Sequence, residues 1–342
     1  MGKYTLPERR YEPIVYKGKK NETILPEFVD ICKKTQMELI EWLPQILVQS
    51  GYTDIIQNDG YIYAKGTVPV LLTAHMDTVH KETVKDFYEN EKDGKHMLSS
   101  PQGIGGDDRC GIYMILEIIK TYKCSVLFCE DEEIGGIGSR EFCKTKFILE
   151  LSELNYLIEL DRAGKDDAVF YDCDNPEFTK FITENTGYIE SCGSFSDISI
   201  LSPACMTASV NLSCGYYKAH TLAEEVVIEE MLNTIEVVKK LLDVESKHFE
   251  YIEANYGYGY GFYDYNKTSY NNGIYYGDSY KNYSSYNKNQ ITTQLLLVAY
   301  TENDEYYAVG KNTDEAWRKL FINNPTLCYN DVKDYEYCDY NY

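Results

Sequence analysis

Short apolar segments that end in histidine or acidic residues are the feature that most restricts what this chain can fold into. Residues 125–130 and 156–160 are apolar runs of the length expected for buried strands. Residues 61–64 and 69–74 predict a further pair of strands, the second of which leads into His75. Apolar strands without polar alternation are buried on both faces and occur in parallel sheets that helices cover. We therefore expect an α/β fold with a mostly parallel central sheet and helices on both faces.

Helical patterns lie between and beside these strands. Residues 24–50 have the apolar spacing of one or two helices, and Pro44 predicts a kink or a break within them. Residues 111–120 and 140–144 predict two shorter helices, and residues 223–242 predict a long amphipathic helix. This alternation of strands and helices is typical of an α/β domain.

The composition changes after Glu250. Residues 251–290 contain twelve tyrosines among glycine, asparagine, serine and lysine, with almost no aliphatic residues, so they predict a linker rather than a packed core. Beyond them, residues 293–300 and 305–309 predict a hairpin, and residues 313–321 predict a helix that Asn312 caps. The expected parts are a main domain at residues 1–250, a linker at 251–290 and a small ββα module at 291–342.

Charge and composition exclude several kinds of partner. The net charge of −22 argues against a nucleic-acid partner, because phosphates need basic contacts. No apolar run approaches about 18 residues, so we expect no membrane span, and the start lacks the apolar stretch of a secretory signal. The eleven cysteines are scattered without a C-x-x-C pair, which favours a reducing, cytoplasmic location. The oligomeric state is left open.

The first two candidate metal ligands are His75 and Asp107. An imidazole at a strand end can bind a metal ion through one nitrogen, while the carboxylate of Asp77 holds the other nitrogen. Asp107 follows two glycines at the start of a helix, where its two oxygens could bridge two cations about 3.5–4 Å apart. Each of these two residues also has a simpler interpretation. A lone histidine is more often structural, and an aspartate at the start of a helix can cap it without binding a metal ion.

The remaining candidates also follow apolar strands. Glu132 and Glu133 come after residues 125–130, and buried acidic groups are costly unless a cation or water receives them. One of these glutamates could then bind a metal ion while its neighbour contacts water, although an acidic surface loop would give the same sequence pattern. Asp161 ends the strand at residues 156–160, with Glu159 as an alternative ligand on the same face, and His220 precedes the last long helix.

Together these residues form a repeated pattern: His, Asp, Glu-Glu, Asp and His occur in this order at the ends of successive elements, where open α/β sheets place their sites. Imidazole and carboxylate ligands suit zinc, with cobalt or manganese as substitutes. We therefore expect two zinc ions.

Residues 69–243 resemble the co-catalytic dizinc exopeptidases and deacylases, a superfamily that includes peptidase T, acetylornithine deacetylase and bacterial leucyl aminopeptidases. The resemblance implies the zinc exopeptidase fold and a site for two metal ions. It also implies a role for each candidate residue. His75 and Asp161 would bind one ion, Glu133 and His220 the other, and Asp107 would bridge them. Asp77 would orient His75, and Glu132 would be the catalytic base.

The resemblance implies hydrolysis of an amide bond by water that two metal ions and Glu132 activate. Only 58 residues separate Asp161 from His220, too few for the lid domain of peptidase T and the deacetylases, and residues 194–204 resemble the lidless aminopeptidases. An aspartate at the position of Asp161 favours an aminopeptidase acting on short peptides. The alternatives are an N-acyl amino acid deacylase on the same site and a non-catalytic binding protein that keeps the fold.

Overall fold

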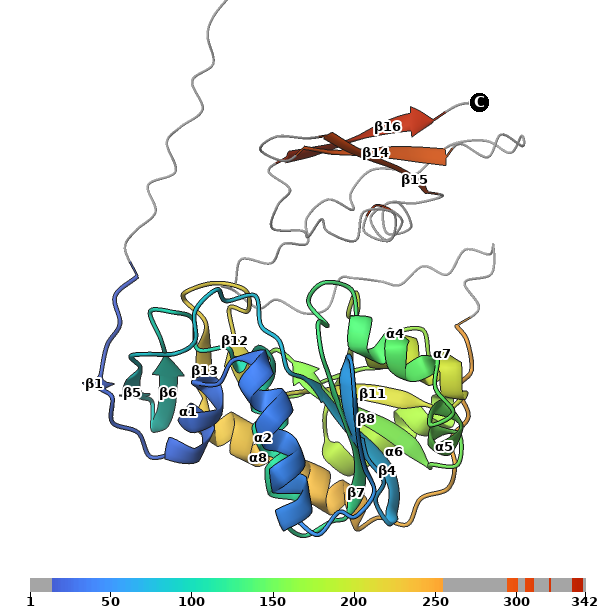
Figure 1. The fold of residues 1–342 in the computed structure, drawn as a ribbon, viewed down its shortest axis with the longest axis horizontal. Coiled ribbons are helices and arrows are strands. Elements are labelled where there is room, and N and C mark those ends of the chain that lie inside the picture. The colour runs from blue at the N-terminus through green and yellow to red at the C-terminus, as the bar shows by residue number, and fades with distance from the viewer. Residues whose placement is uncertain (1–13, 255–293, 301–304, 311–319, 321–333, 341–342) are drawn as a thin grey trace, which may run out of the picture. The chain divides into compact units, whose positions relative to one another are not determined.

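The computed structural model describes residues 14–254, 294–300, 305–310, 320 and 334–340 (Figure 1). The chain divides into two compact units, Met1–Asn255 and Tyr256–Tyr342. The first unit contains an eight-stranded sheet. Its strands, in spatial order, are β10 (Ile189–Ser191), β9 (Asp167–Val169), β11 (Ser209–Ser213), β8 (Tyr156–Arg162), β4 (Val68–His75), β7 (Cys124–Cys129), β3 (Tyr61–Ala64) and β2 (Ile55–Asn58).

The central strands β11, β8, β4 and β7 are parallel to one another, whereas β2 and β3 form an antiparallel edge. Side chains of each central strand are buried on both faces. On β4, Leu72 belongs to one hydrophobic cluster and its neighbour Leu71 to the other, and on β8 Ile158 and Leu157 divide in the same way. Because both faces are covered, these strands lack polar alternation. The predicted α/β class with a mostly parallel central sheet is confirmed.

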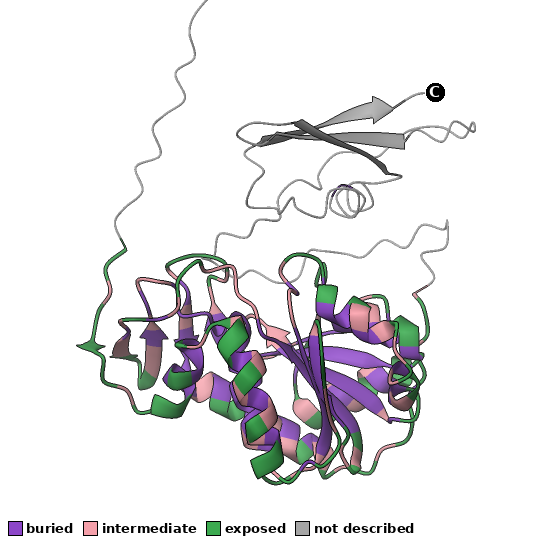
Figure 2. Cartoon of the chain, viewed as in Figure 1, coloured by how far each residue is buried: buried purple, intermediate pink, exposed green. Residues whose placement is uncertain are grey.

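Helices cover the two faces of the sheet (Figure 1). The larger cluster contains apolar residues of the first group of helices: α1 (Pro26–Cys32), α2 (Gln36–Gln49), α3 (Gly106–Ile118), α6 (Pro176–Thr186) and α8 (Ile228–Leu242). The smaller cluster contains apolar residues of the second group: α4 (Ile137–Cys143), α5 (Ile148–Leu151) and α7 (Ile198–Cys205). Figure 2 shows the resulting pattern, with buried strands between helices that are buried on one side and exposed on the other.

Pro44 does not break the second helix. α2 runs without interruption from Gln36 to Gln49, and the boundary between the first two helices lies before it, at Thr35. A proline has no N–H to donate to the carbonyl four residues earlier. Here the side chain of Gln57, on the neighbouring strand β2, donates to that carbonyl of Ile40 at 3.2 Å. A tertiary contact therefore replaces the missing helical hydrogen bond.

The predicted helix at residues 223–242 begins later than expected. Residues Glu225–Val227 form strand β13, and α8 starts only at Ile228. β13 belongs to a five-stranded antiparallel sheet that the sequence patterns did not predict. Its strands, in spatial order, are β1 (Lys19–Lys20), β5 (Tyr88–Lys92), β6 (Lys95–Ser99), β13 and β12 (Tyr216–Tyr217). Pairing with β6 and β12 holds this segment extended, which overrides its helical pattern.

The second unit contains a three-stranded antiparallel sheet with strand order β15 (Glu305–Gly310), β14 (Gln294–Tyr300) and β16 (Asp334–Tyr340). The first two strands match the predicted hairpin, and β16 was not predicted. The helix predicted at residues 313–321 lies outside the described residues except for Leu320, and the linker predicted at residues 251–290 lies almost wholly outside them. The division at residues 250 and 290 therefore stays a prediction.

Among the described residues, no helix is both long and apolar enough to cross a membrane.

The start of α2 offers a test of the local structure. Thr35 and Glu38 form a capping box, in which the Thr35 hydroxyl accepts from the Glu38 N–H at 3.2 Å and the Glu38 carboxylate accepts from the Thr35 N–H at 2.8 Å. We expect Thr35→Ala to lower the free energy of unfolding by about 1 kcal/mol, because one helix N–H loses its partner. Urea denaturation measures this change. Thr35→Ser keeps the hydroxyl and is the matched control, so an equal loss in both variants would contradict the capping role.

Candidate metal centre

The carboxyl ends of three neighbouring strands bring the candidate ligands together. β8, β4 and β7 are adjacent and parallel, so His75 at the end of β4, Asp161 near the end of β8 and the acidic residues after β7 meet at one edge of the sheet. Asp107 comes from the first turn of α3, and His220 comes from the loop between β12 and β13. Residues far apart in the sequence therefore surround one site.

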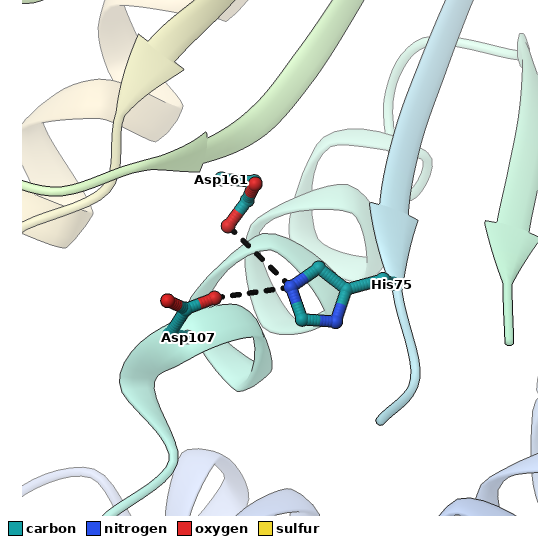
Figure 3. Close-up of side chains that lie close together, drawn as sticks. All are labelled: His75, Asp107 and Asp161. Carbon is teal, nitrogen blue, oxygen red and sulfur yellow. Dashed lines mark hydrogen bonds and ion pairs between the residues drawn. The ribbon is translucent and has the colours of Figure 1, made fainter. Parts of the chain in front are cut away.

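His75 is fully buried and has a different partner at each ring nitrogen. Its Nδ1 lies 3.1 Å from an oxygen of Asp77. Its Nε2 faces the Oδ1 atoms of Asp107 at 3.0 Å and of Asp161 at 3.5 Å, as Figure 3 shows. A carboxylate at Nδ1 holds the proton on that nitrogen and leaves the Nε2 lone pair free for a cation.

Asp77 also organises the acidic loop after β7. Its Oδ1 accepts a hydrogen bond from the N–H of Glu132, and its Oδ2 accepts one from the N–H of Glu133, both at 3.0 Å. The same carboxylate therefore orients the His75 ring and fixes the backbone that carries two acidic side chains.

A second group of candidate ligands shares Asp107 with the first. The Nε2 of His220 lies 3.1 Å from Oδ2 of Asp107 and 3.1 Å from Oε1 of Glu133. Asp107 thus directs Oδ1 to one histidine and Oδ2 to the other. Within each group, His75–Asp107–Asp161 and Asp107–Glu133–His220, the ligand atoms lie within 4.8 Å of one another. A carboxylate with one oxygen in each group is placed to bridge two cations.

The charges at this site are consistent with bound cations. Burial raises the pKa of Glu132 well above its usual range, and burial together with the charge of Asp107 raises the pKa of Asp161 to about 7. Burial also acts to raise the pKa of Asp107, but hydrogen bonds to His220 and His75 outweigh it and lower that pKa. In the part of the chain that the structure describes, His75 and His220 are the only basic side chains that pair directly with these carboxylates, and no lysine or arginine does so.

The residues present therefore fit a pair of divalent cations. Hydrogen bonds to Asp107 and Glu133 raise the pKa of His220 to about 11. Imidazole nitrogens and carboxylate oxygens are the ligands that zinc binds in catalytic sites. His220 also has a backbone φ of 62°, in the left-handed region that costs free energy for a residue with a side chain.

The structure distinguishes Asp161 from Glu159, the alternative ligand. Glu159 is fully buried, and its Oε2 accepts hydrogen bonds from the hydroxyl of Ser196 and from the N–H of Ile198. It therefore contacts the loop that leads into α7, whereas Asp161 faces His75. Two of the other histidines lie elsewhere: His96 pairs with Glu229 on a neighbouring element, and His248 is exposed.

Three supporting residues were not identified from the sequence. Asp108 accepts a hydrogen bond from the backbone N–H of His75 at 3.2 Å, and the hydroxyl of Tyr216 donates to the backbone oxygen of Asp161 at 2.9 Å. Glu224 accepts hydrogen bonds beside Asp107. Of these three residues, only Asp108 could have been found from the sequence, because it is adjacent to the candidate ligand Asp107. Glu224 fitted the first turn of a predicted helix, and Tyr216 lies in a segment without a motif.

Residues 162–219 form β9, α6, β10, α7, β11 and β12, all of which join or pack on the two sheets of the first unit. No separate domain lies in this stretch, all of which the structure describes. The predicted absence of a lid domain between Asp161 and His220 is confirmed.

Comparison with known proteins agrees with this fold. Residues 62–192, which include all the candidate ligands except His220, match the sequence profile of peptidase family M28. The aminopeptidase PepT from Bacillus cereus has a similar structure, with a TM-score of 0.50 and 16% identity over 64% of this chain and 96% of that chain. A tripeptidase from Staphylococcus aureus is similar to the same extent, with a TM-score of 0.50 and 16% identity over the same shares of the two chains. No curated protein sequence matches the chain. The resemblance to the zinc exopeptidase superfamily is therefore confirmed.

The shared carboxylate leads to a prediction about metal content. We expect two divalent ions per purified chain and one ion in His220→Ala, because His220 belongs to only one group. We expect Asp107→Ala to lose both ions, because the two groups share Asp107. Elemental analysis by mass spectrometry measures this. Asp131→Ala is the control, since that carboxylate contacts Gln36 instead of either group. Two ions retained in Asp107→Ala would contradict the bridging position.

Proposed function

We propose that this protein is a metal-dependent exopeptidase that removes residues from the amino end of short peptides. The observation that carries the proposal is the position of Asp107, which directs one carboxylate oxygen to each of two histidine–carboxylate groups. The match of residues 62–192 to peptidase family M28 supports a peptidase. The likeness of the fold to a tripeptidase and to an aminopeptidase is consistent with it.

In this proposal His75 and Asp161 would hold one zinc ion, Glu133 and His220 would hold the other, and Asp107 would contribute a ligand to both. Cobalt or manganese could replace zinc with the same ligands. Two bound divalent ions supply Lewis acid chemistry, which polarises the scissile carbonyl and makes water a nucleophile near neutral pH. Asp77 keeps His75 in the tautomer that presents Nε2 to the site.

Glu132 is the proposed general base and acid. Its side chain is buried, its backbone N–H is held by Asp77, and the charges of His75 and Asp161 act on it, so it lies beside the candidate ligands. A raised pKa suits this role, because the carboxylate must accept a proton from the attacking water and then return it to the leaving nitrogen. Glu133 next to it reaches His220 instead.

The comparisons favour substrates with a free amino terminus. Two solved structures of similar fold are an aminopeptidase and a tripeptidase. In the described residues no lysine or arginine pairs with the candidate ligands, so none of these contacts offers a cationic side chain for the free carboxylate of an N-acyl amino acid. We therefore favour the aminopeptidase over the deacylase.

Replacing the proposed base tests catalysis. We expect Glu132→Gln to lower kcat by about 10²–10⁴-fold, because the amide accepts no proton, while two metal ions stay bound. Steady-state kinetics with a tripeptide and metal analysis of the same sample measure both. Glu141→Gln removes an exposed carboxylate that pairs with Lys144 and serves as the control. Unchanged turnover in Glu132→Gln would favour a non-catalytic binding protein with the same fold.

A substrate series tests which end is recognised. We expect Leu-Gly-Gly to be cleaved, and both N-acetyl-Leu-Gly-Gly and N-acetyl-leucine to be poor substrates, because acetylation blocks the free amino terminus that an aminopeptidase recognises. Liquid chromatography of the products identifies the bond that is cleaved. Turnover of the N-acetylated amino acid alone would overturn the aminopeptidase proposal in favour of the deacylase.

A further inference from the structure

Glu224 is a fully buried carboxylate beside the candidate metal centre that neither group of ligands includes. Its Oε2 accepts a hydrogen bond from the N–H of Gly105 at 2.8 Å, and its Oε1 accepts one from the N–H of Asp107 at 3.1 Å. The Nε2 of His80 lies 2.7 Å from Oε2 of Glu224. A carboxylate with this degree of burial is costly unless such partners satisfy it.

The two backbone hydrogen bonds act at the start of α3. Asp107 and Asp108 have non-helical backbone angles, so the N–H groups of Gly105 and Asp107 lie outside the regular part of the helix and need partners from elsewhere. Glu224, 119 residues away from Gly105 in sequence, supplies a partner for both. Because it holds the N–H of Asp107 itself, it restricts the direction in which that carboxylate points.

Glu224 also ends the turn that carries the second histidine. It lies four residues after His220, and its own N–H donates to the carbonyl of Thr221 at 3.0 Å. His220 has a left-handed backbone within this turn. A turn that contains such a residue needs contacts at its ends to keep its shape, and the contacts of Glu224 with Gly105 and Asp107 are of this kind.

His80 links Glu224 to a third loop, the one that follows His75. It lies five residues after His75, and its imidazole is nearly buried against Gly103, where a Cβ atom would come within 2.2 Å of the ring. Gly103 has a φ of +84°, so a glycine at this position permits both the backbone turn and the close approach of His80. The loops that carry His75, Asp107 and His220 therefore meet at one buried carboxylate.

We propose that Glu224, together with His80, is a positioning residue that keeps the bridging ligand Asp107 and the ligand His220 at the separation two metal ions require. The proposal rests on the metal site assigned above. Its consequence is that loss of Glu224 weakens metal binding without removing any ligand. Supporting residues behind metal ligands commonly affect affinity by about 10–100-fold when they are replaced.

Glu224→Gln is the direct test, and Glu225→Gln is its matched control. A glutamine has nearly the same shape but only one acceptor oxygen, so it cannot accept from both N–H groups. Glu225 is the next residue, at the start of β13, and its carboxylate pairs with Lys218. Competition with a chelator measures the zinc affinity of each folded variant. We expect about 10–100-fold weaker binding of at least one ion in Glu224→Gln, wild-type affinity in Glu225→Gln, and activity of Glu224→Gln that returns as zinc is raised.

The visible absorption of a cobalt-substituted sample is a second measurement, and a loss of stability alone would not shift it. We expect the visible absorption of bound cobalt to shift in Glu224→Gln, because the directions of Asp107 and His220 change, and to stay the same in Glu225→Gln. If Glu224→Gln does not fold, His80→Phe keeps a ring of similar size and removes the contact with Glu224. It should then weaken zinc binding in the same direction.

The possible failures can be told apart. Wild-type protein that binds fewer than two ions would overturn the metal site itself and this proposal with it. Wild-type protein that binds two ions, together with equal zinc affinity in Glu224→Gln and Glu225→Gln, would overturn only the role of Glu224. If Glu224→Gln does not fold and His80→Phe does, a wild-type zinc affinity in His80→Phe would overturn the role of Glu224.

Discussion

Several carboxylates are buried at one edge of the central sheet, and most of the first unit is arranged around that constraint. Asp107, Glu132, Glu133 and Asp161 lie together with little exposure to water, and the only positive partners that the structure describes for them are His75 and His220. Such a group is unstable as a set of bare anions. The proposed divalent cations would offset these buried charges and would supply the chemistry of amide hydrolysis.

The ligands are held by a surrounding set of carboxylates and backbone groups. Asp77 holds the ring of His75 and two backbone N–H groups of the acidic loop, and Asp108 accepts from the backbone N–H of His75. Glu224 does the same for the loop of Asp107. These contacts join the segments that follow β4 and β7 to the start of α3, so the candidate ligands have protein partners in the absence of substrate. Preorganised charges of this kind need little rearrangement during a reaction.

The first unit achieves this without a lid domain. The chain between Asp161 and His220 completes the central sheet and the small antiparallel sheet instead of forming a separate domain. β12 and β13 of the small sheet flank the loop that carries His220, and Tyr216 of β12 contacts Asp161. The antiparallel sheet therefore takes part in building the site, which is a role that its short, weakly patterned strands did not suggest.

The sequence by itself determined the fold class and most of the candidate ligands. Buried parallel strands need continuous apolar runs, and side chains at their carboxyl ends must meet, so His75, Asp107 and the Glu132–Glu133 pair could be predicted from local patterns. Tertiary structure decided what depends on contacts between distant residues. Gln57 compensates for Pro44. Glu159 accepts from the N–H of Ile198, whereas Asp161 faces His75. Pairing with β6 turns residues 225–227 into a strand. The contact between His80 and Glu224 joins positions 144 residues apart, and no periodicity in a sequence encodes such a contact.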